Sequence, residues 1–316
     1  MKALIIGAAG FVGKHLITHL KSLGWEVSAT RLPQEEIKED VKNYELDILN
    51  QAAISSLLDK IRPDCIFHLA AQSSVALSWE KPALTVDINI KGSVNLLEAL
   101  RVMQNPPKVL LVGSGEEYGY ILPEELPIKE DTLMRPRNIY ACTKVAQDLL
   151  GQTYAHAYKL EIILVRAFNH TGPGQIDSFA AAHFCRQIAE IEAGLHPPVI
   201  YVGNLSSLRD FTDVRDIVKA YTLLIQKGKS GKAYNVGSGK VVAMQEVLEI
   251  ALSMAKTNII VKQDPALMRV SDTPVIQADI TSLISETGWK PQIPLQDTIA
   301  DMLDDWRKKI DIMKKE

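Results

Sequence analysis

The sequence predicts an α/β fold in which helices cover a parallel sheet on both faces. Apolar runs recur along the chain as far as residue 236, and amphipathic helix patterns such as Ala52–Ile61 and Val94–Met103 lie between them. A glycine-rich turn ends the first run. Such alternation is typical of a doubly wound sheet, which binds ligands at the carboxyl ends of its strands. We therefore expect the functional residues to follow the strands.

The strands are predicted from runs of the aliphatic residues that a sheet buried on both faces requires. After the sixth run the pattern changes to a stretch rich in glycine and proline, 170–175, and to helix patterns that lie outside the sheet, such as Phe179–Ala193, Met244–Ala255 and Leu295–Lys308. The predicted strands are Lys2–Ile6, Glu26–Thr30, Tyr44–Leu46, Asp64–Leu69, Lys108–Val112, Glu161–Val165 and Ala233–Val236.

This change predicts two domains: a Rossmann-type doubly wound sheet and a smaller C-terminal substrate domain that closes over the strand ends. We expect the dinucleotide-binding domain to comprise residues 1–167, 213–237 and about 273–281, and the substrate domain to comprise 168–212, 238–272 and 282–316.

Composition excludes several classes of function. The net charge is -3 with both signs interspersed, which predicts no nucleic-acid partner and no membrane partner. The three cysteines, Cys65, Cys142 and Cys185, are widely spaced, so neither a disulfide framework nor a metal site is expected. No apolar run reaches transmembrane length, and the N-terminal run is too short for a signal peptide. A reducing, cytoplasmic location fits these features.

The glycine turn predicts dinucleotide binding. Ala3 to Ile6 form the predicted strand, Gly7, Gly10 and Gly13 form the turn, and Lys14 to Leu23 continue as a helix pattern. A helix N-terminus offers unpaired N–H groups and a positive dipole to a pyrophosphate, and glycines allow the backbone to come close. A plain turn that packs a helix on a strand is the alternative.

Tyr140 and Lys144 form the candidate catalytic pair, because a spacing of four residues places both on one face of a helix. A phenol that exchanges protons near neutrality needs its pKa lowered by about three units, and a neighbouring ammonium supplies part of that shift. Ser114 ends the fifth predicted strand, where its hydroxyl could donate to a carbonyl oxygen beside Tyr140. Glu116 and Glu117 follow; both could be solvated loop acids, or Glu116 could act as a base or bind sugar hydroxyls.

The chain resembles the extended short-chain dehydrogenase/reductases that act on nucleotide sugars, through the motifs Gly7–Gly13, His68–Gln72, Ser114, Tyr140–Lys144 and Arg209–Val214. Within this superfamily it most resembles the GDP-4-keto-6-deoxy-D-mannose reductases, which form GDP-D-rhamnose. The stretches that carry the narrower resemblance are Phe168–Gln175, Arg209–Asp216 and Arg269–Asp272.

The resemblance implies NAD(P)H-dependent reduction of a C4 ketone. It assigns binding of the carbonyl to Ser114 and Tyr140, proton donation to Tyr140, and to Lys144 both a lower phenol pKa and a hold on the nicotinamide ribose. It also implies that Asn89 supports Lys144 through water; the alternative is a polar residue inside an amphipathic helix. The expected cofactor-binding residues are Gly7, Gly10, Phe11, Val12, Gly13, Arg31, Asp47, Ile48, Leu69, Ala70, Ala71, Asn89, Tyr140 and Lys144.

Arg31 ends the second predicted strand, where an NAD site usually has Asp or Glu for the ribose hydroxyl. A cation at this position suits a 2′-phosphate, so NADP(H) is favoured and NAD(H) stays possible. The resemblance also implies contacts to the GDP-sugar substrate. Arg186 is not included among them, because it could equally be a solvated helix residue. The expected contacts are Ser114, Gly115, Glu116, Asn169, Arg209, Arg269 and Asp272.

Three alternatives stay open. GDP-mannose 4,6-dehydratases share the Tyr, the Lys and a Glu in the position of Glu116, but carry a stretch of the type NHESPRRG where this chain has Asn169–Gln175. An epimerase acting on a UDP-sugar is a second alternative, and a catalytically silent NADP-binding regulator is a third.

Apolar faces on the helix patterns Ala83–Met103 and Ile139–Ala157 predict a homodimer.

Overall fold

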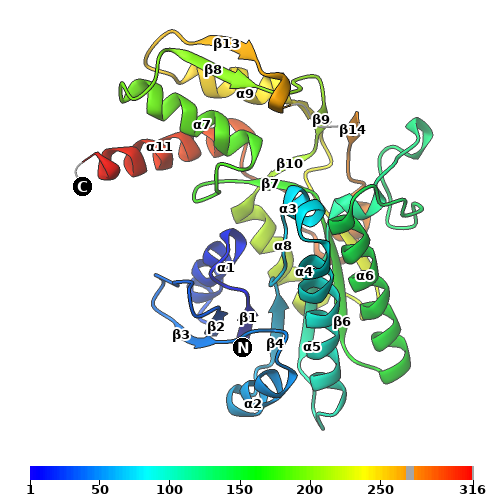
Figure 1. Cartoon of the computed structure of the whole chain (residues 1–316). Helices are drawn as coiled ribbons and strands as arrows, with labels where there is room; N and C mark the ends of the chain where they lie inside the picture. The colour runs from blue at the N-terminus through cyan, green and yellow to red at the C-terminus, as the bar shows by residue number, and fades with distance from the viewer. Residues whose placement is uncertain (268–273, 315–316) are drawn as a thin grey trace.

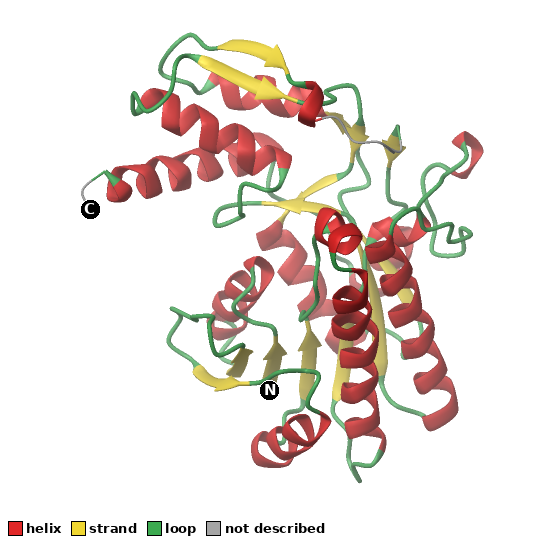
Figure 2. Cartoon of the chain, in the orientation of Figure 1, coloured by secondary structure: helices red, strands yellow, loops and turns green. Residues whose placement is uncertain are grey.

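A seven-stranded parallel sheet forms the centre of the larger part of the molecule (Figures 1 and 2). The computed structural model describes residues 1–267 and 274–314. All seven strands predicted from the sequence join this one sheet, in the order β11-β6-β5-β4-β1-β2-β3. They are β1 (Lys2–Ile6), β2 (Glu26–Arg31), β3 (Lys42–Glu45), β4 (Cys65–His68), β5 (Lys108–Val112), β6 (Ile162–Ala167) and β11 (Ala233–Val236).

Helices cover both faces of the sheet, and alternate strand residues take part in the two layers. On β1, Ala3 and Ile5 pack with helices α1 (Phe11–Ser22) and α8 (Val214–Lys227). Leu4 and Ile6 belong to the core on the opposite face. That second core includes side chains of α2 (Gln51–Ile61), α5 (Gly92–Arg101) and α6 (Ile139–Tyr158). The predicted doubly wound sheet is therefore confirmed.

Short helices complete this part of the chain and bring loops to the carboxyl edge of the sheet. One stretch is irregular: α3 (Val75–Glu80), α4 (Pro82–Val86) and the π-helical turn η1 (Asp87–Lys91) lead into α5. The 3-10 turns η2 (Gly115–Tyr118) and η3 (Pro123–Glu125) follow β5, and α10 (Thr281–Thr287) contacts α8. The turn η2 directly follows β5, so it lies at the edge where ligands of such sheets bind.

The C-terminal half builds a separate hydrophobic core, which lies above the sheet in Figure 1. It contains side chains of α7 (Ala180–Glu192), α9 (Met244–Ser253), α11 (Leu295–Met313) and β8 (Val199–Val202), and the exposed strand β13 (Ile260–Gln263) pairs with β8. Short strands and one further 3-10 turn link the two parts: β7 (Asn169–Thr171), β9 (Leu208–Arg209), β10 (Phe211–Asp213), β12 (Val242–Ala243), β14 (Val275–Ile276) and η4 (Pro265–Leu267). Across residues 1–267 and 274–314, no helix is both long and apolar enough to span a bilayer.

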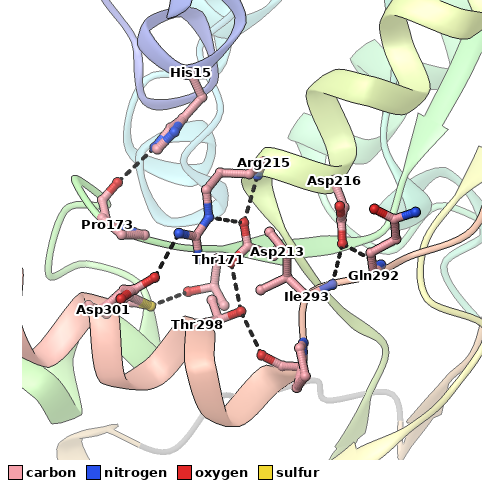
Figure 3. A network of polar contacts seen from close by, with 12 residues as sticks. His15, Thr171, Pro173, Asp213, Arg215, Asp216, Gln292, Ile293, Thr298 and Asp301 are labelled. Carbon is pink, nitrogen blue, oxygen red and sulfur yellow. Dashed lines mark hydrogen bonds and ion pairs between the residues drawn. The ribbon is translucent and has the colours of Figure 1, made fainter. Parts of the chain in front are cut away.

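Polar contacts at the start of α8 join the two parts (Figure 3). Asp213 caps α8 and accepts a hydrogen bond from Thr298 of α11 at 2.7 Å. Arg215 bridges Asp213 and Asp301, with N–O distances of 2.7 Å to both carboxylates. On α1, His15 Nε2 lies 2.8 Å from the carbonyl oxygen of Pro173. The later residues of the Arg209–Asp216 motif therefore fasten α11 to the sheet.

Candidate active site

The glycine turn after β1 leaves no room for a side chain at Gly7 or Gly13. A Cβ on Gly7 would lie 2.6 Å from the backbone nitrogen of Ala70, and a Cβ on Gly13 would lie 2.2 Å from the carbonyl oxygen of Ala8. Gly10 is the N-cap of α1 and provides no side-chain cap, so the first N–H groups of the helix have no side-chain acceptor there. The turn thus has the close backbone approach and the open helix N-terminus that a pyrophosphate needs.

The remaining predicted cofactor residues lie in α1 or follow strands that end at the same edge of the sheet. Phe11, in the first turn of α1, stacks on His170 with ring centroids 6.2 Å apart. Ile48 follows β3; its carbonyl accepts a hydrogen bond from Asn95 of α5 at 2.9 Å. The others are Val12 in α1, Asp47 after β3, and Leu69 and Ala71 after β4.

Arg31 lies at the carboxyl end of β2, as predicted, but its guanidinium has partners within the chain. It contacts Glu45 of β3 at 3.3 Å and donates to the carbonyl oxygens of Leu32 and Pro33 at 3.1 and 3.2 Å. An incoming 2′-phosphate would therefore compete with the Glu45 carboxylate for this cation.

Asn89 is buried in the π-helical turn η1 and all its polar groups are engaged. Its Oδ1 accepts from the Gln72 N–H at 2.8 Å, and its Nδ2 donates to the Gln72 carbonyl at 3.0 Å and to Thr143 Oγ1 at 2.9 Å. These contacts tie the loop after β4 to α6, and the support of Lys144 through water stays a prediction.

Ser114 and Tyr140 come together at the carboxyl end of β5. Helix α6 begins at Ile139 because Asn138 caps it, and this places Tyr140 in the first turn, beside Ser114. Helix α6 contacts η2, the turn that Ser114 caps. Burial raises the pKa of Tyr140 above its ordinary value; the Ser114 hydroxyl opposes this rise, and the Glu117 and Glu116 charges add to it.

Lys144 is buried one helical turn after Tyr140. Its Nζ donates to the carbonyl oxygen of Val112 at 2.7 Å and to Oε1 of Gln147 at 2.8 Å. Burial lowers the pKa of Lys144, while the Glu117 charge raises it. Burial raises the pKa of Tyr140, and the ammonium is engaged by Val112 and Gln147, so the lowered phenol pKa expected from the Tyr140 and Lys144 spacing stays a prediction.

Glu116 faces the start of α6. Its Oε2 accepts a hydrogen bond from Asn138 Nδ2 at 3.0 Å, and its backbone N–H donates to Ser114 Oγ at 3.2 Å. Gly115 lies against the ring of Phe168, where an added Cβ would come within 3.3 Å. One helix cap therefore holds both the Glu116 carboxylate and the first turn of the helix that carries Tyr140.

Glu117 is the site residue that sequence reasoning missed. The expectation of a solvated loop acid is wrong for it, because its side chain is 0% exposed. Its Oε1 accepts from the Ser114 N–H at 2.7 Å, and its Oε2 lies 3.4 Å from Arg166 Nε. The spacing of Ser114 and Glu117 is that of a capping box, which is the signal that could have indicated this contact.

The expected substrate residues come from the segments that link the two parts. Asn169 is an exposed residue of β7, whereas Arg209 of β9 is 9% exposed and donates to the Leu208 carbonyl at 2.9 Å. Arg186 pairs with Asp177 and with Glu190 on α7. Arg269 and Asp272 lie outside the described residues.

Comparisons with known proteins agree with this arrangement. A family profile described as GDP-mannose 4,6 dehydratase matches residues 4–302. A GDP-6-deoxy-D-mannose reductase from Pseudomonas aeruginosa is 33% identical over 309 residues, which cover 98% of each chain. The solved structure of RMD from Pseudomonas aeruginosa complexed with NADPH superposes with a TM-score of 0.87 at 33% identity, covering 98% of this chain and 100% of that one.

A more distant solved structure has the same fold. UDP-glucose 4-epimerase from Thermus thermophilus, in complex with NAD, has a TM-score of 0.86 at 27% identity, covering 97% of this chain and 99% of that one. These matches extend over both parts of the molecule. The chain therefore belongs to the GDP-mannose 4,6-dehydratase family, within the extended short-chain dehydrogenase/reductases.

Proposed function

We propose that this enzyme reduces the C4 ketone of GDP-4-keto-6-deoxy-D-mannose to GDP-D-rhamnose, with NADPH as reductant. The observation that carries the proposal is the meeting of Ser114 and Tyr140 at the carboxyl end of β5, at the same sheet edge as the glycine turn. The similarity to the Pseudomonas aeruginosa reductase and to the NADPH-bound structure supports the choice of substrate and cofactor.

The two parts of the molecule would share the binding. We assign the dinucleotide to residues 1–167, 213–237 and about 273–281, and the GDP-sugar chiefly to 168–212, 238–272 and 282–316. Gly7, Gly10 and Gly13 fit a pyrophosphate at the uncapped start of α1. Because its cysteines Cys65, Cys142 and Cys185 are free thiols, we place the enzyme in the cytoplasm.

Reduction requires one proton and one hydride at the ketone. NADPH, when bound, supplies the hydride to C4. The Ser114 hydroxyl donates a hydrogen bond to the ketone oxygen, and Tyr140 transfers its phenolic proton to that oxygen as the C=O double bond becomes a C–O single bond. Charged Lys144 then stabilises the phenolate that remains until a proton returns.

A 4,6-dehydratase is the second candidate, because Glu116 is held beside Ser114 by Asn138 and the family profile carries that description. Dehydratases and 4-epimerases begin by oxidising a C4 hydroxyl, which requires the tyrosine to act as a base. The stretch Asn169–Gln175 departs from the NHESPRRG type of the dehydratases, and the similarity to the Pseudomonas aeruginosa reductase supports reduction over either alternative. The intact catalytic pair Tyr140 and Lys144 also argues against a silent NADP-binding regulator.

The deciding experiment measures NADPH oxidation and product formation in wild type and in Glu116→Gln. We expect one NADPH to be oxidised for each GDP-4-keto-6-deoxy-D-mannose reduced, no dehydration of GDP-mannose, and GDP-D-rhamnose identified by NMR. Glu116→Gln should lower kcat/KM by about tenfold or less and leave ketone reduction measurable, because Glu116 positions the sugar but transfers no proton. Conversion of GDP-mannose to the 4-keto sugar, lost in Glu116→Gln, would instead establish the dehydratase.

Cofactor preference is expected to depend on Arg31. Arg31→Ala should reduce the ratio of kcat/KM for NADPH over NADH by about 10- to 100-fold, since a hydrogen bond to a charged group contributes about 1.5–3 kcal/mol. Glu45→Gln is the matched control: it removes the carboxylate that competes for the guanidinium, so it should keep or raise the preference. An unchanged ratio in Arg31→Ala would show that other residues read the 2′-phosphate.

We also propose a homodimer formed through α4, α5 and α6. Leu84 of α4 and Leu149 of α6 are 41% and 49% exposed, so these helices keep apolar side chains that a second copy would cover. Light scattering at micromolar concentration should report a dimer, and Leu149→Arg should shift it to the monomer. Ile260→Arg, at a similarly exposed position on β13, should leave the dimer intact. A monomeric wild type would exclude this assembly.

A further inference from the structure

Glu117 is a buried carboxylate directly behind Ser114. Its side chain is 0% exposed and Oε1 accepts the Ser114 N–H at 2.7 Å. Gly113 leaves the space that this carboxylate fills, because a Cβ there would lie 2.2 Å from Oε1. Gly113, Ser114 and Glu117 thus form one packed unit at the end of β5, and the position of Ser114 depends on the carboxylate.

Pairing with Arg166 alone does not explain why a carboxylate is buried at position 117, because Arg166 has other partners. Arg166 already donates to Asp148 at 2.9 and 3.3 Å, to Tyr118 Oη at 2.9 Å and to the Glu130 carbonyl at 2.7 Å. By contrast, Glu117 Oε2 has only the 3.4 Å ion pair and no hydrogen bond within the described residues. A buried charge is costly to desolvate, so a carboxylate kept beside catalytic groups indicates a role there.

We infer that Glu117 is a positioning residue for the proposed ketone reduction: it fixes the Ser114 hydroxyl opposite Tyr140 and keeps Lys144 charged. This inference rests on the proposed function for its kinetic effect. The carboxylate anchors the Ser114 N–H, and Ser114 Oγ is further oriented by the Glu116 N–H at 3.2 Å. The Ser114 hydroxyl can then meet the ketone oxygen without rearrangement, which is what preorganised donors provide.

The electrostatic part follows from the groups around Lys144. Lys144 Nζ donates to the Val112 carbonyl oxygen at 2.7 Å, and Glu117 Oε1 packs against the next residue, Gly113, so the ammonium and the carboxylate are neighbours. The other titratable or charged groups around this pair are His68 of β4, Asp148 and Arg166. Burial raises the pKa of Glu117 and Asp148 adds to this, whereas Arg166, the Ser114 N–H and Lys144 lower it. Arg166 lies 3.4 Å from Oε2, and the Lys144 ammonium lies on the Val112 carbonyl beside Gly113; because these two cations flank the carboxylate, we assign it as ionised. Its charge therefore favours the ammonium form of Lys144.

Three variants separate positioning from charge and from structure. Glu117→Met keeps the approximate volume but removes the acceptor for the Ser114 N–H. Glu117→Gln keeps that acceptor and removes the charge. Asp148→Asn is the matched control, because Asp148 is the other carboxylate on Arg166 and makes no contact with Ser114. Thermal unfolding and NADPH binding are measured for all three.

We expect Glu117→Met to lower kcat by about 10- to 100-fold with little change in the KM for the sugar, because a displaced Ser114 stabilises the transition state less well. Glu117→Gln should retain most of kcat near neutrality. On the basic side of the pH profile, its activity should begin to fall at a lower pH than that of wild type, because Lys144 loses its proton more readily. Asp148→Asn should lower thermal stability and leave kcat within about threefold. Equal losses of kcat in Asp148→Asn and Glu117→Met would overturn the inference.

A measurement without substrate keeps this inference distinct from the proposed function. Titration of carbon-13-labelled lysines by NMR, with Lys144 assigned through Lys144→Met, should give a lower Lys144 pKa in Glu117→Gln than in wild type. An unchanged Lys144 pKa removes the electrostatic role even if the ketone is reduced. A shifted Lys144 pKa in a protein that does not oxidise NADPH with the GDP-keto sugar would refute the proposed function alone.

Discussion

Tyr140→Phe is expected to lower kcat for ketone reduction by about a thousandfold, which lies within the range that positioned acids and bases contribute. The phenol is the acid placed beside Ser114 at the carboxyl end of β5, and the substitution removes its proton without changing the ring. Steady-state loss of NADPH absorbance at saturating substrate measures the effect.

The fold and cofactor binding should survive Tyr140→Phe. The side chain is 8% exposed and sits in the first turn of a helix capped by Asn138, so the ring can keep its packing. Thermal unfolding and NADPH binding should therefore match wild type. If Tyr140→Phe retains kcat within tenfold, another group supplies the proton, and Glu116, held 3.0 Å from Asn138 Nδ2, is the first to test.

The sheet could be predicted from sequence because its strands obey a local rule. A parallel strand covered on both faces is rich in apolar residues, and the runs 109–112 of β5 and 162–165 of β6 are apolar throughout. The short strands β9 and β12 were not predicted, since two residues cannot show a period and their pairing comes from contacts distant in sequence. The π-helical turn at Asp87–Lys91 lies inside a predicted helix pattern, and five residues are too few to distinguish a π-helical from an α-helical period.

The candidate site was predictable where one motif sets the geometry. The spacing of Tyr140 and Lys144 fixes their helix face, and the strand end fixes Ser114. Contacts made by other parts of the chain were not predictable. Glu45 approaches Arg31 from the neighbouring strand, and Arg166 approaches Glu117 from β6. Pairings of this kind depend on which strands are neighbours, and a single sequence does not show that order.

Gly7→Ala is expected to destabilise the protein by about 2–5 kcal/mol and to abolish NADPH binding. Gly7 has a φ of 81°, in the left-handed region, which costs a residue with a Cβ about 1–2 kcal/mol. The added Cβ would also lie 2.6 Å from the backbone of Ala70, and overpacking of this kind costs about 1–3 kcal/mol. Urea unfolding measures the first effect, and NADPH fluorescence titration measures the second.

Gly10→Ala is the control that separates folding from cofactor binding in the same turn. Gly10 has a φ of -68°, and the nearest atom to an added Cβ is the Gly7 carbonyl oxygen at 3.5 Å, an ordinary contact. The variant should therefore unfold like wild type. If a pyrophosphate lies against the start of α1, the new methyl group meets it and NADPH binding weakens by at least about tenfold. Unchanged binding in Gly10→Ala would place the pyrophosphate elsewhere and leave the glycine turn a purely structural feature.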